Sequence, residues 1–181
     1  KNSSSGRTNI IEYVTIASTG NASDFGDLSA SKSLLSGLAS ATRGIFGGGD
    51  TSGGSSQINV IEYITIASTG DATDFGDLDT ARKNLSSCAS TTRGVFGGGE
   101  VGSTGKNEID YITIASTGNA TDFGDLTVAR LYISSSSNST RGLFGGGYTG
   151  SNSNVIDYIT IASTGNATDF GDLVAATQSP S

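Results

Sequence analysis

Paired carboxylates are the residues of this chain with the clearest capacity for chemistry. The segment DFGDL occurs four times and places two aspartates three positions apart, as in Asp74 and Asp77. Such a pair could ligate Ca²⁺ through its oxygen atoms or act as the acid and base of a glycosidase. Because the pair recurs in every repeat, we expect it instead to cap turns and to pair with the repeated arginines. We therefore expect no cofactor, with calcium as the alternative.

Other side chains that commonly perform catalysis are scarce. The chain has no His, which excludes Ser-His-Asp and Cys-His sites as well as His-ligated metals. Its single Cys, Cys88, lies among small residues and is expected to be a core residue rather than a nucleophile. The DFG triplet is not accompanied by the phosphate-binding loop or the HRD segment of a kinase. We therefore expect a protein that is not an enzyme.

Charge gives a further constraint on partners. The net charge of −7 argues against binding to nucleic acid or to anionic membranes. No stretch approaches the ~20 apolar residues of a membrane-spanning helix, so we expect no membrane insertion. One arginine recurs in each copy of the segment TRG-x-FGGG. We expect it to bind a carboxylate or carbonyl of a neighbouring repeat, with an anion-binding channel as the alternative. These arginines are Arg43, Arg93 and Arg141.

The elements that position these residues belong to a tandem repeat. Copies of the segment I-[ED]-Y-[VI]-T-I-A-S-T-G begin at Ile11, Ile61, Ile109 and Ile156. Each repeat is interpreted as four short β-strands, and no segment has helical periodicity. The third strand carries apolar residues on both faces, Val60 on one and Ile61 on the other, so both faces should be covered. Four antiparallel strands repeated every ~50 residues around an axis predict a β-propeller.

The repeats resemble those of the kelch family of propellers. In that pattern a glycine run ends the second strand, Tyr lies in the third, an aromatic residue lies in the fourth, and a basic residue follows. Here these positions hold glycines 47–49, Tyr63, Phe75 and Arg82, with copies in the other repeats. The chain departs from the pattern in its three-glycine run, in Phe instead of Trp, and in Thr177 at the last basic position. The resemblance implies an all-β propeller of four-stranded antiparallel blades, about three and a half of which lie here.

The repeat boundaries divide the chain into one half blade and three full blades. Residues 1–28 would supply strands three and four of the half blade. Residues 29–78, 79–126 and 127–173 would form the full blades, and residues 174–181 a tail toward a next blade. This division predicts fourteen strands and leaves the half blade without its two inner strands. We expect those strands to come from a longer parent polypeptide or from a second chain.

One phenylalanine per repeat is expected to anchor its blade. All four rings should be buried, and replacement of each by Ala should cost ~3–5 kcal/mol in an intact ring. They are Phe25, Phe75, Phe123 and Phe170.

The loop between strands two and three absorbs every change in repeat length. Its three copies, DTSGGSSQ, EVGSTGKN and YTGSNSN, are also the least alike. In an antiparallel meander this loop lies at the same end as the connection to the next blade, which makes that end the candidate working face. As an exposed loop residue, Asp50 should affect stability by less than ~0.5 kcal/mol when replaced by Ala. The candidate ligand-binding residues are Asp50, Glu100, Lys106, Tyr148 and Asn152.

The repeat sequences are also similar to those of tail-type or fibre-type structural proteins of marine and cyanobacterial phages. The segments TRGVFGGG and YITIASTGNATDFGDL carry this similarity. It implies an extracellular virion component without enzymatic activity, which presents its variable loops to proteins or to host-surface glycans. Its partners would be other virion proteins or further copies of itself. The alternatives are a secreted bacterial lectin and a polysaccharide-active enzyme that uses the repeated aspartates.

Overall fold

The chain folds as an all-β structure of four antiparallel sheets. The computed structural model describes residues 7–52 and 56–179, and within them it contains fifteen strands and no helix. The described residues therefore contain no helix that could cross a membrane. None of the four sheets closes on itself.

The sheets follow the order of the sequence. Sheet 1 contains β1 (Thr8–Tyr13) and β2 (Ser23–Lys32). Sheet 2 contains β3 (Ser36–Ala39), β4 (Arg43–Gly47), β5 (Val60–Thr65) and β6 (Thr73–Asp77). Sheet 3 contains β7 (Ser86–Ala89), β8 (Arg93–Gly97), β9 (Glu100–Val101), β10 (Thr104–Thr113) and β11 (Thr121–Arg130). Sheet 4 contains β12 (Ser134–Ser137), β13 (Arg141–Gly145), β14 (Val155–Thr160) and β15 (Thr168–Asp172).

The four strands predicted for each full repeat are present in sheets 2, 3 and 4, each antiparallel to the next. The predicted total of fourteen is one too few. In sheet 3 the short loop closes as a hairpin at Gly102 (φ 63°), and its first side becomes β9, which pairs with the start of β10. Strands β2 and β11 also continue past the predicted boundaries at residues 28 and 126, ending at Lys32 and Arg130.

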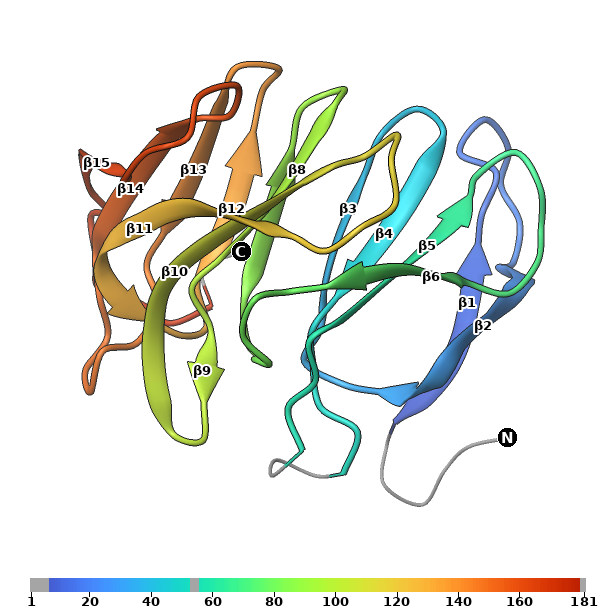
Figure 1. Cartoon of the computed structure of the whole chain (residues 1–181), viewed down its shortest axis with the longest axis horizontal. Coiled ribbons are helices and arrows are strands. Elements are labelled where there is room, and N and C mark those ends of the chain that lie inside the picture. Colours follow the sequence, from blue (N-terminus) through green and yellow to red (C-terminus); the bar gives the residue numbers. More distant parts are fainter. Residues whose placement is uncertain (1–6, 53–55, 180–181) are drawn as a thin grey trace.

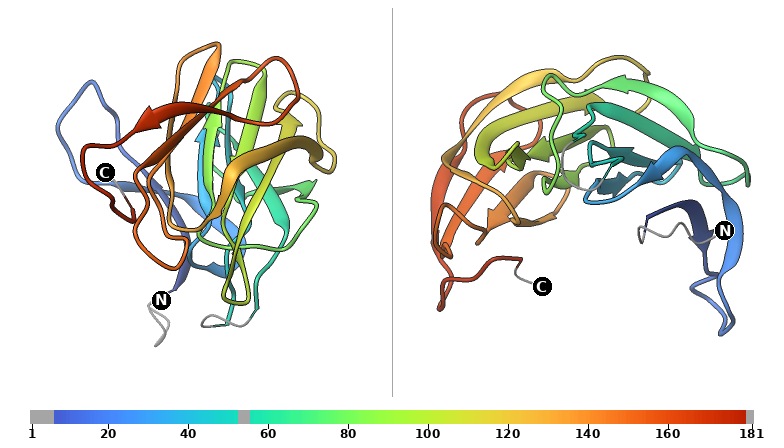
Figure 2. Two further views of the ribbon diagram at one scale, coloured as in Figure 1. Left: turned by 90° about the vertical axis from the view of Figure 1, so that its left-hand side faces the viewer. Right: turned by 90° about the horizontal axis from the view of Figure 1, so that it is seen from below.

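The sheets follow one another along an open arc, with sheet 1 at one end and sheet 4 at the other (Figures 1 and 2). The first strands of the full repeats, β3, β7 and β12, lie beside one another. Ser36 Oγ is 2.7 Å from Ser87 Oγ, and Ser86 donates to Ser135 Oγ at 2.6 Å. Small hydroxyl side chains thus allow these strands to approach closely and to bond across the sheets.

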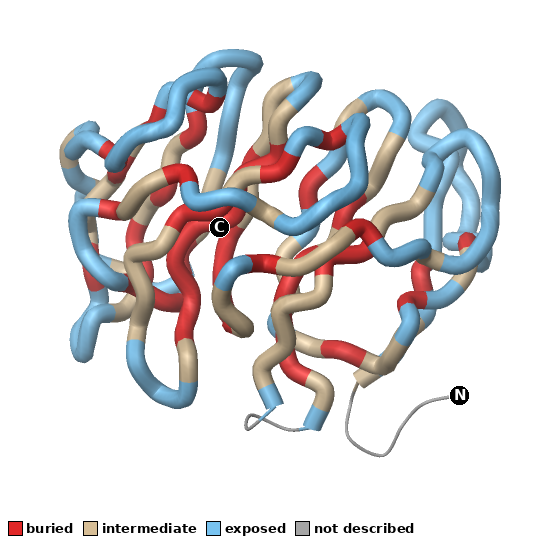
Figure 3. Tube along the Cα trace, viewed as in Figure 1, coloured by how far each residue is buried: buried red, intermediate tan, exposed pale blue. Residues whose placement is uncertain are grey.

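The core consists of separate apolar layers between neighbouring sheets. The layer between sheets 3 and 4, for example, joins Val95 and Phe123 of sheet 3 to Phe144 and Ile159 of sheet 4. Equivalent layers lie between sheets 2 and 3 and between sheets 1 and 2. The buried segments in Figure 3 accordingly follow the strands that face another sheet. Each sheet therefore depends on its neighbours for burial.

The glycine run at the end of each second strand explains how the sheets pack so closely. A Cβ atom on Gly97 would lie only 2.8 Å from Cε1 of Phe144 in the next sheet. The two following residues, Gly98 and Gly99, have φ values of 63° and 100°, a region that favours glycine. The first glycine thus seats a neighbouring ring, and the other two begin the variable loop.

Candidate functional site

Two of the three repeated arginines, Arg43 and Arg93, lie at the contacts between sheets. The Arg43 guanidinium stacks on the Tyr63 ring at 4.3 Å from its centroid, and Tyr63 packs edge-on against Phe75 at 5.9 Å. Arg43 also donates to the carbonyl of Ile114 in the next sheet at 2.7 Å. This contact confirms the predicted carbonyl partner, and Arg93 repeats it in the next sheet. Among the described residues, no carboxylate pairs with Arg43, Arg93 or Arg141.

The predicted aromatic anchors are buried in three repeats and exposed in the fourth. Phe25, Phe75 and Phe123 are at most 7% exposed, which confirms the prediction for these rings. Phe170 is 53% exposed, so the prediction is wrong there. The cause is its position, because Phe123 is covered by Ala167 of sheet 4, whereas no further sheet of the described residues covers Phe170.

Each contact between sheets also contains a buried ion pair that the sequence analysis did not identify. The cation follows the Phe of one repeat by seven positions, as Arg82 follows Phe75. The acid lies between Ile and Tyr in the third strand of the next sheet. Its recurrence at one position of every repeat is the signal that could have revealed it. The pairs are Lys32 with Glu62, Arg82 with Asp110 at 2.8 Å, and Arg130 with Asp157 at 2.5 Å.

Burial perturbs several titratable groups at these contacts. Burial alone raises the pKa of the Glu62 carboxyl, but hydrogen bonds from Lys32 and Ser29 outweigh it, so the pKa lies below its ordinary value. Burial raises the pKa of Asp110 against the opposing charge of Arg82. Burial also raises the pKa of the Cys88 thiol to about 12. Cys88 is therefore a protonated core residue at neutral pH, as predicted.

Two of the five candidate ligand-binding residues are buried. The Asp50 side chain is fully buried, and its carboxylate accepts backbone N–H groups of Ser52 at 3.0 Å and Ser56 at 3.3 Å. Glu100 is also buried and binds Lys83 Nζ at 3.2 Å and Asn84 Nδ2 at 3.0 Å. Predicting them as exposed ligand-binding residues was therefore wrong. The small stability effect expected for Asp50→Ala assumed an exposed side chain and loses its basis.

The position of these acids has a clear structural cause. The residue directly after each glycine run forms backbone bridges with the connection that leads into its own sheet. These bridges join Asp50 to Ser33, Glu100 to Lys83 and Tyr148 to Leu131. The loop between strands two and three therefore does lie at the same end as the connection between repeats. In sheets 2 and 3, however, the first residue of this loop, Asp50 or Glu100, has a buried side chain.

The remaining candidates lie on the loop face of sheets 3 and 4. Tyr148 is half-buried and lines a groove of about 370 Å³ together with Leu131 and the hairpin residues 103–105. Asn152 is exposed and forms a backbone bridge with Tyr148. Lys106 lies outside the lining, with Nζ 3.5 Å from the Glu108 carboxylate. The structure thus brings two variable loops together around Tyr148 and places Asp50 in another sheet.

The lining of this groove, called here the Tyr148 groove, defines what it can do chemically. It consists of one aromatic ring, the hydroxyl side chains of Ser103, Thr104 and Thr149, two glycines, and the apolar side chains of Ala129 and Leu131. No carboxylate or cation belongs to the lining. Such a surface is suited to stacking and hydrogen bonding with a ligand.

The repeated aspartates lie within strands β2, β6, β11 and β15. Asp122 accepts the N–H of Gly124 at 3.0 Å, and Asp169 accepts the N–H of Gly171 at 3.0 Å. Both contacts lie within strands, so the prediction that these aspartates cap turns is wrong here. Among the described residues, none of the repeated aspartates forms an ion pair with Arg43, Arg93 or Arg141 either. Within residues 7–52 and 56–179, no group of three or more Cys, Asp and Glu side chains has the arrangement needed to hold a metal ion.

No model of a known protein family matches this sequence, and no curated protein does. The likeness to kelch repeats stays a prediction that depends on the glycine runs, Tyr63 and Phe75 with their copies. The features of the molecule that bear on function are the Tyr148 groove and the repeated contacts between sheets.

Proposed function

We propose that this chain is part of a kelch-like β-propeller that acts, without enzymatic activity, as an extracellular structural or adhesion module of a virion. In this proposal sheets 2, 3 and 4 are full blades, and sheet 1 is the outer half of another. The Tyr148 groove binds a neutral glycan of the host surface. The observation that carries the proposal is a Tyr ring set among hydroxyl groups where two variable loops meet.

Two observations support the propeller. Four-stranded antiparallel sheets follow one another along an arc (Figure 2), and the first strands of the full repeats lie together. The contacts between neighbouring sheets also repeat the same ion pair, the same Phe and the same hydrogen bonds from one repeat to the next. Repeated contacts of this kind favour the same relation between successive sheets, as between the blades of a propeller.

The composition of the groove supports a neutral glycan as the ligand. The flat face of the Tyr148 ring offers a stacking surface for the C–H face of a sugar, and the hydroxyls of Ser103 and Thr104 can exchange hydrogen bonds with sugar hydroxyls. The volume of about 370 Å³ falls within the ~300–1,000 Å³ typical of small-ligand sites. The net charge of −7 disfavours anionic polysaccharides.

A glycan-binding assay tests the ligand. Wild-type chain, Tyr148→Ala and the control Thr91→Ala would be applied to arrayed surface polysaccharides of candidate hosts. Thr91 is exposed at a hairpin outside the groove lining. We expect wild type and Thr91→Ala to bind the same neutral glycan and Tyr148→Ala to lose at least ~10-fold in affinity. Equal binding by Tyr148→Ala would contradict the site, and release of reducing sugar would show an enzyme instead.

The virion assignment has its own test. Peptides of this chain should be found by mass spectrometry in purified virions and should stay with them after extensive washing. Their presence only in the soluble secreted fraction of a bacterial culture would favour the lectin alternative.

A further inference from the structure

The contact between sheets 3 and 4 has a backbone pattern that recurs along the chain. Gly165 N–H donates to the carbonyl of Phe123 at 2.7 Å, and Ala167 N–H donates to that of Asp125 at 2.7 Å. Asn166 between them accepts the N–H of Asp125 at 3.1 Å. The same three hydrogen bonds join sheets 2 and 3, and they also join sheets 1 and 2, where Asp71 takes the place of Asn.

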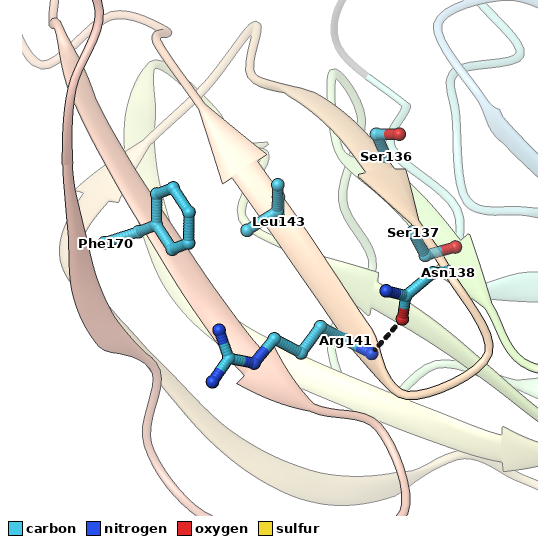
Figure 4. Close-up of a pocket in the computed structure, with 6 residues that line it drawn as sticks. All are labelled: Ser136, Ser137, Asn138, Arg141, Leu143 and Phe170. Atoms are coloured by element: carbon cyan, nitrogen blue, oxygen red, sulfur yellow. Dashed lines mark hydrogen bonds between the residues drawn. The ribbon is translucent and has the colours of Figure 1, made fainter.

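The outer face of sheet 4 has the accepting side of this contact, with Phe170 and Asp172 at the positions of Phe123 and Asp125. A groove of about 400 Å³ lies there, lined by residues 136–138 with Arg141, Leu143 and Phe170 (Figure 4). Arg141 stacks on Tyr158 as the other repeated arginines do on their tyrosines, yet its guanidinium is exposed. A Cβ on Gly171 would meet nothing within 4 Å, whereas a Cβ on its counterpart Gly124 would lie 2.5 Å from the backbone of Gly165.

Sheet 1 carries the donating half of the pattern on its free side. Gly20, Asn21 and Ala22 hold the positions that residues 165–167 occupy in the fourth repeat. Ile16 is 99% exposed, whereas its counterpart Ile161 is fully buried and accepts a hydrogen bond from Arg93 through its carbonyl. The two ends of the arc thus expose the two halves of one contact.

We propose that a second copy of this chain docks head to tail, with its sheet 1 on the outer face of sheet 4. A second copy fits this face because the sequence of its residues 11–22 repeats that of the segments that cover the equivalent faces of sheets 2 and 3. In this register Arg141 donates to the carbonyl of Ile16, and Gly20 N–H donates to the carbonyl of Phe170. Val14, which is exposed, enters the groove between Arg141 and Leu143.

Sheet 1 has no counterpart of β12 and β13, so docking completes the contact only at the outer strands. The buried ion pair of those outer strands is also left incomplete. Glu12 is the acid at the position of Asp157, and the N–H of Val174 corresponds to that of Thr127, which donates to Asp157 at 3.3 Å. The cation position opposite Glu12 holds Thr177. Docking therefore buries a carboxylate without its cation, which weakens the association.

The surface is heterologous, so each docked copy leaves the same two faces free at the ends of the assembly. Such contacts produce a closed ring if the rotation between copies allows it and an open filament if it does not. The inference depends on the repeated contact between sheets and is independent of glycan binding by the Tyr148 groove.

Sedimentation velocity of the intact chain over a range of concentrations tests the proposal. Thr177→Arg should tighten the association ~10-fold or more, since it supplies the missing cation. Glu12→Gln should tighten it in the wild-type background, because the unpaired carboxylate is gone, and should weaken it in the Thr177→Arg background. Arg141→Ala should weaken it in both backgrounds, and Thr91→Ala should match wild type.

The opposite sign of the Glu12→Gln effect in the two backgrounds is the decisive result. Sedimentation that is unaffected by Thr177→Arg, or a Glu12→Gln effect of the same sign in both, would overturn the proposal. Circular dichroism of each variant verifies the fold. Glu12, Arg141 and Thr91 are exposed and Thr177 is half-buried, so the circular dichroism spectrum distinguishes a failure to associate from a failure to fold.

Discussion

Strands β11 and β15 share the pentapeptide TDFGD, but they differ in what covers them. In β11 the Phe123 ring is 2% exposed beneath sheet 4, and in β15 the Phe170 ring is 53% exposed. The arginines of the same two sheets differ likewise, because Arg93 bonds to the next sheet and Arg141 is exposed. In this fold the neighbouring sheet, rather than the local sequence, decides whether a repeated residue is buried.

The neighbouring sheet also affects how much a repeated residue contributes to stability. Stability in a tandem array is approximately a sum of the intrinsic stability of each repeat and of the contacts between neighbours. A residue of β11 contributes to both terms, whereas its copy in β15 contributes only to the first. Identical substitutions at the two positions should therefore have different costs, and the difference measures the contact.

The largest difference is expected at the phenylalanines. Phe123→Ala should lower the free energy of unfolding by ~3–5 kcal/mol, because it leaves a cavity between two sheets. Phe170→Ala should lower it by less than ~1 kcal/mol, because this residue is 53% exposed. Urea unfolding followed by circular dichroism gives both values. Equal costs would show that sheet 4 does not cover Phe123 in solution.

A smaller difference is expected at two glycines with similar backbone geometry. Gly124 and Gly171 have φ values of 139° and 135°, so the strain of an Ala substitution is shared and cancels in the comparison. A Cβ on Gly124 would lie 2.5 Å from the backbone of Gly165, whereas one on Gly171 meets nothing within 4 Å. Gly124→Ala should therefore cost ~1–3 kcal/mol more than Gly171→Ala. The same unfolding measurement decides, and a difference near zero would contradict the close approach.

The smallest effect concerns pH. The pKa of Glu62 in the folded chain lies below its ordinary value, so its contribution to stability is present above the pKa of the unfolded chain. It is lost as the pH falls through the lower folded pKa. Between about pH 5 and pH 3, Glu62→Gln should therefore make the loss of stability with falling pH shallower, by roughly 1 kcal/mol or less.

Glu12→Gln is the matched control for this measurement, because Glu12 is exposed at the same repeat position. Unfolding of the monomeric chain at a series of pH values should show the wild-type slope for Glu12→Gln. A Glu62→Gln curve parallel to that of wild type would contradict the lowered pKa.

The repeats made most of the fold predictable. Alternating apolar residues, glycine runs and short loops located the strands of all three full repeats, because these patterns depend only on local geometry. The extra strand β9 was missed because a two-residue strand leaves no periodicity to read. The exposure of Phe170 was missed because it depends on the residues that surround sheet 4 and not on its own repeat.

The candidate site was less predictable than the fold. Asp50 occupies the most variable loop, where acids are usually solvated, and its burial depends on N–H groups of Ser52 and Ser56 that the loop turns inward. The buried ion pairs join residues about 30 positions apart on different sheets, so local pattern does not reveal them. Only the fixed repeat positions of Arg82 and Asp110 with their copies carried that signal.

Amide hydrogen exchange within the identical TDFGDL segments of sheets 3 and 4 tests most directly the claim that neighbouring sheets decide burial. Because the sequences of residues 121–126 and 168–173 match, their intrinsic exchange rates are nearly equal and any difference reports structure. The exchange would be followed by NMR at a concentration at which the chain is monomeric. We expect the amides of residues 121–126 to exchange at least ~10-fold more slowly than those of residues 168–173. Equal rates, or slower exchange in residues 168–173, would contradict the account.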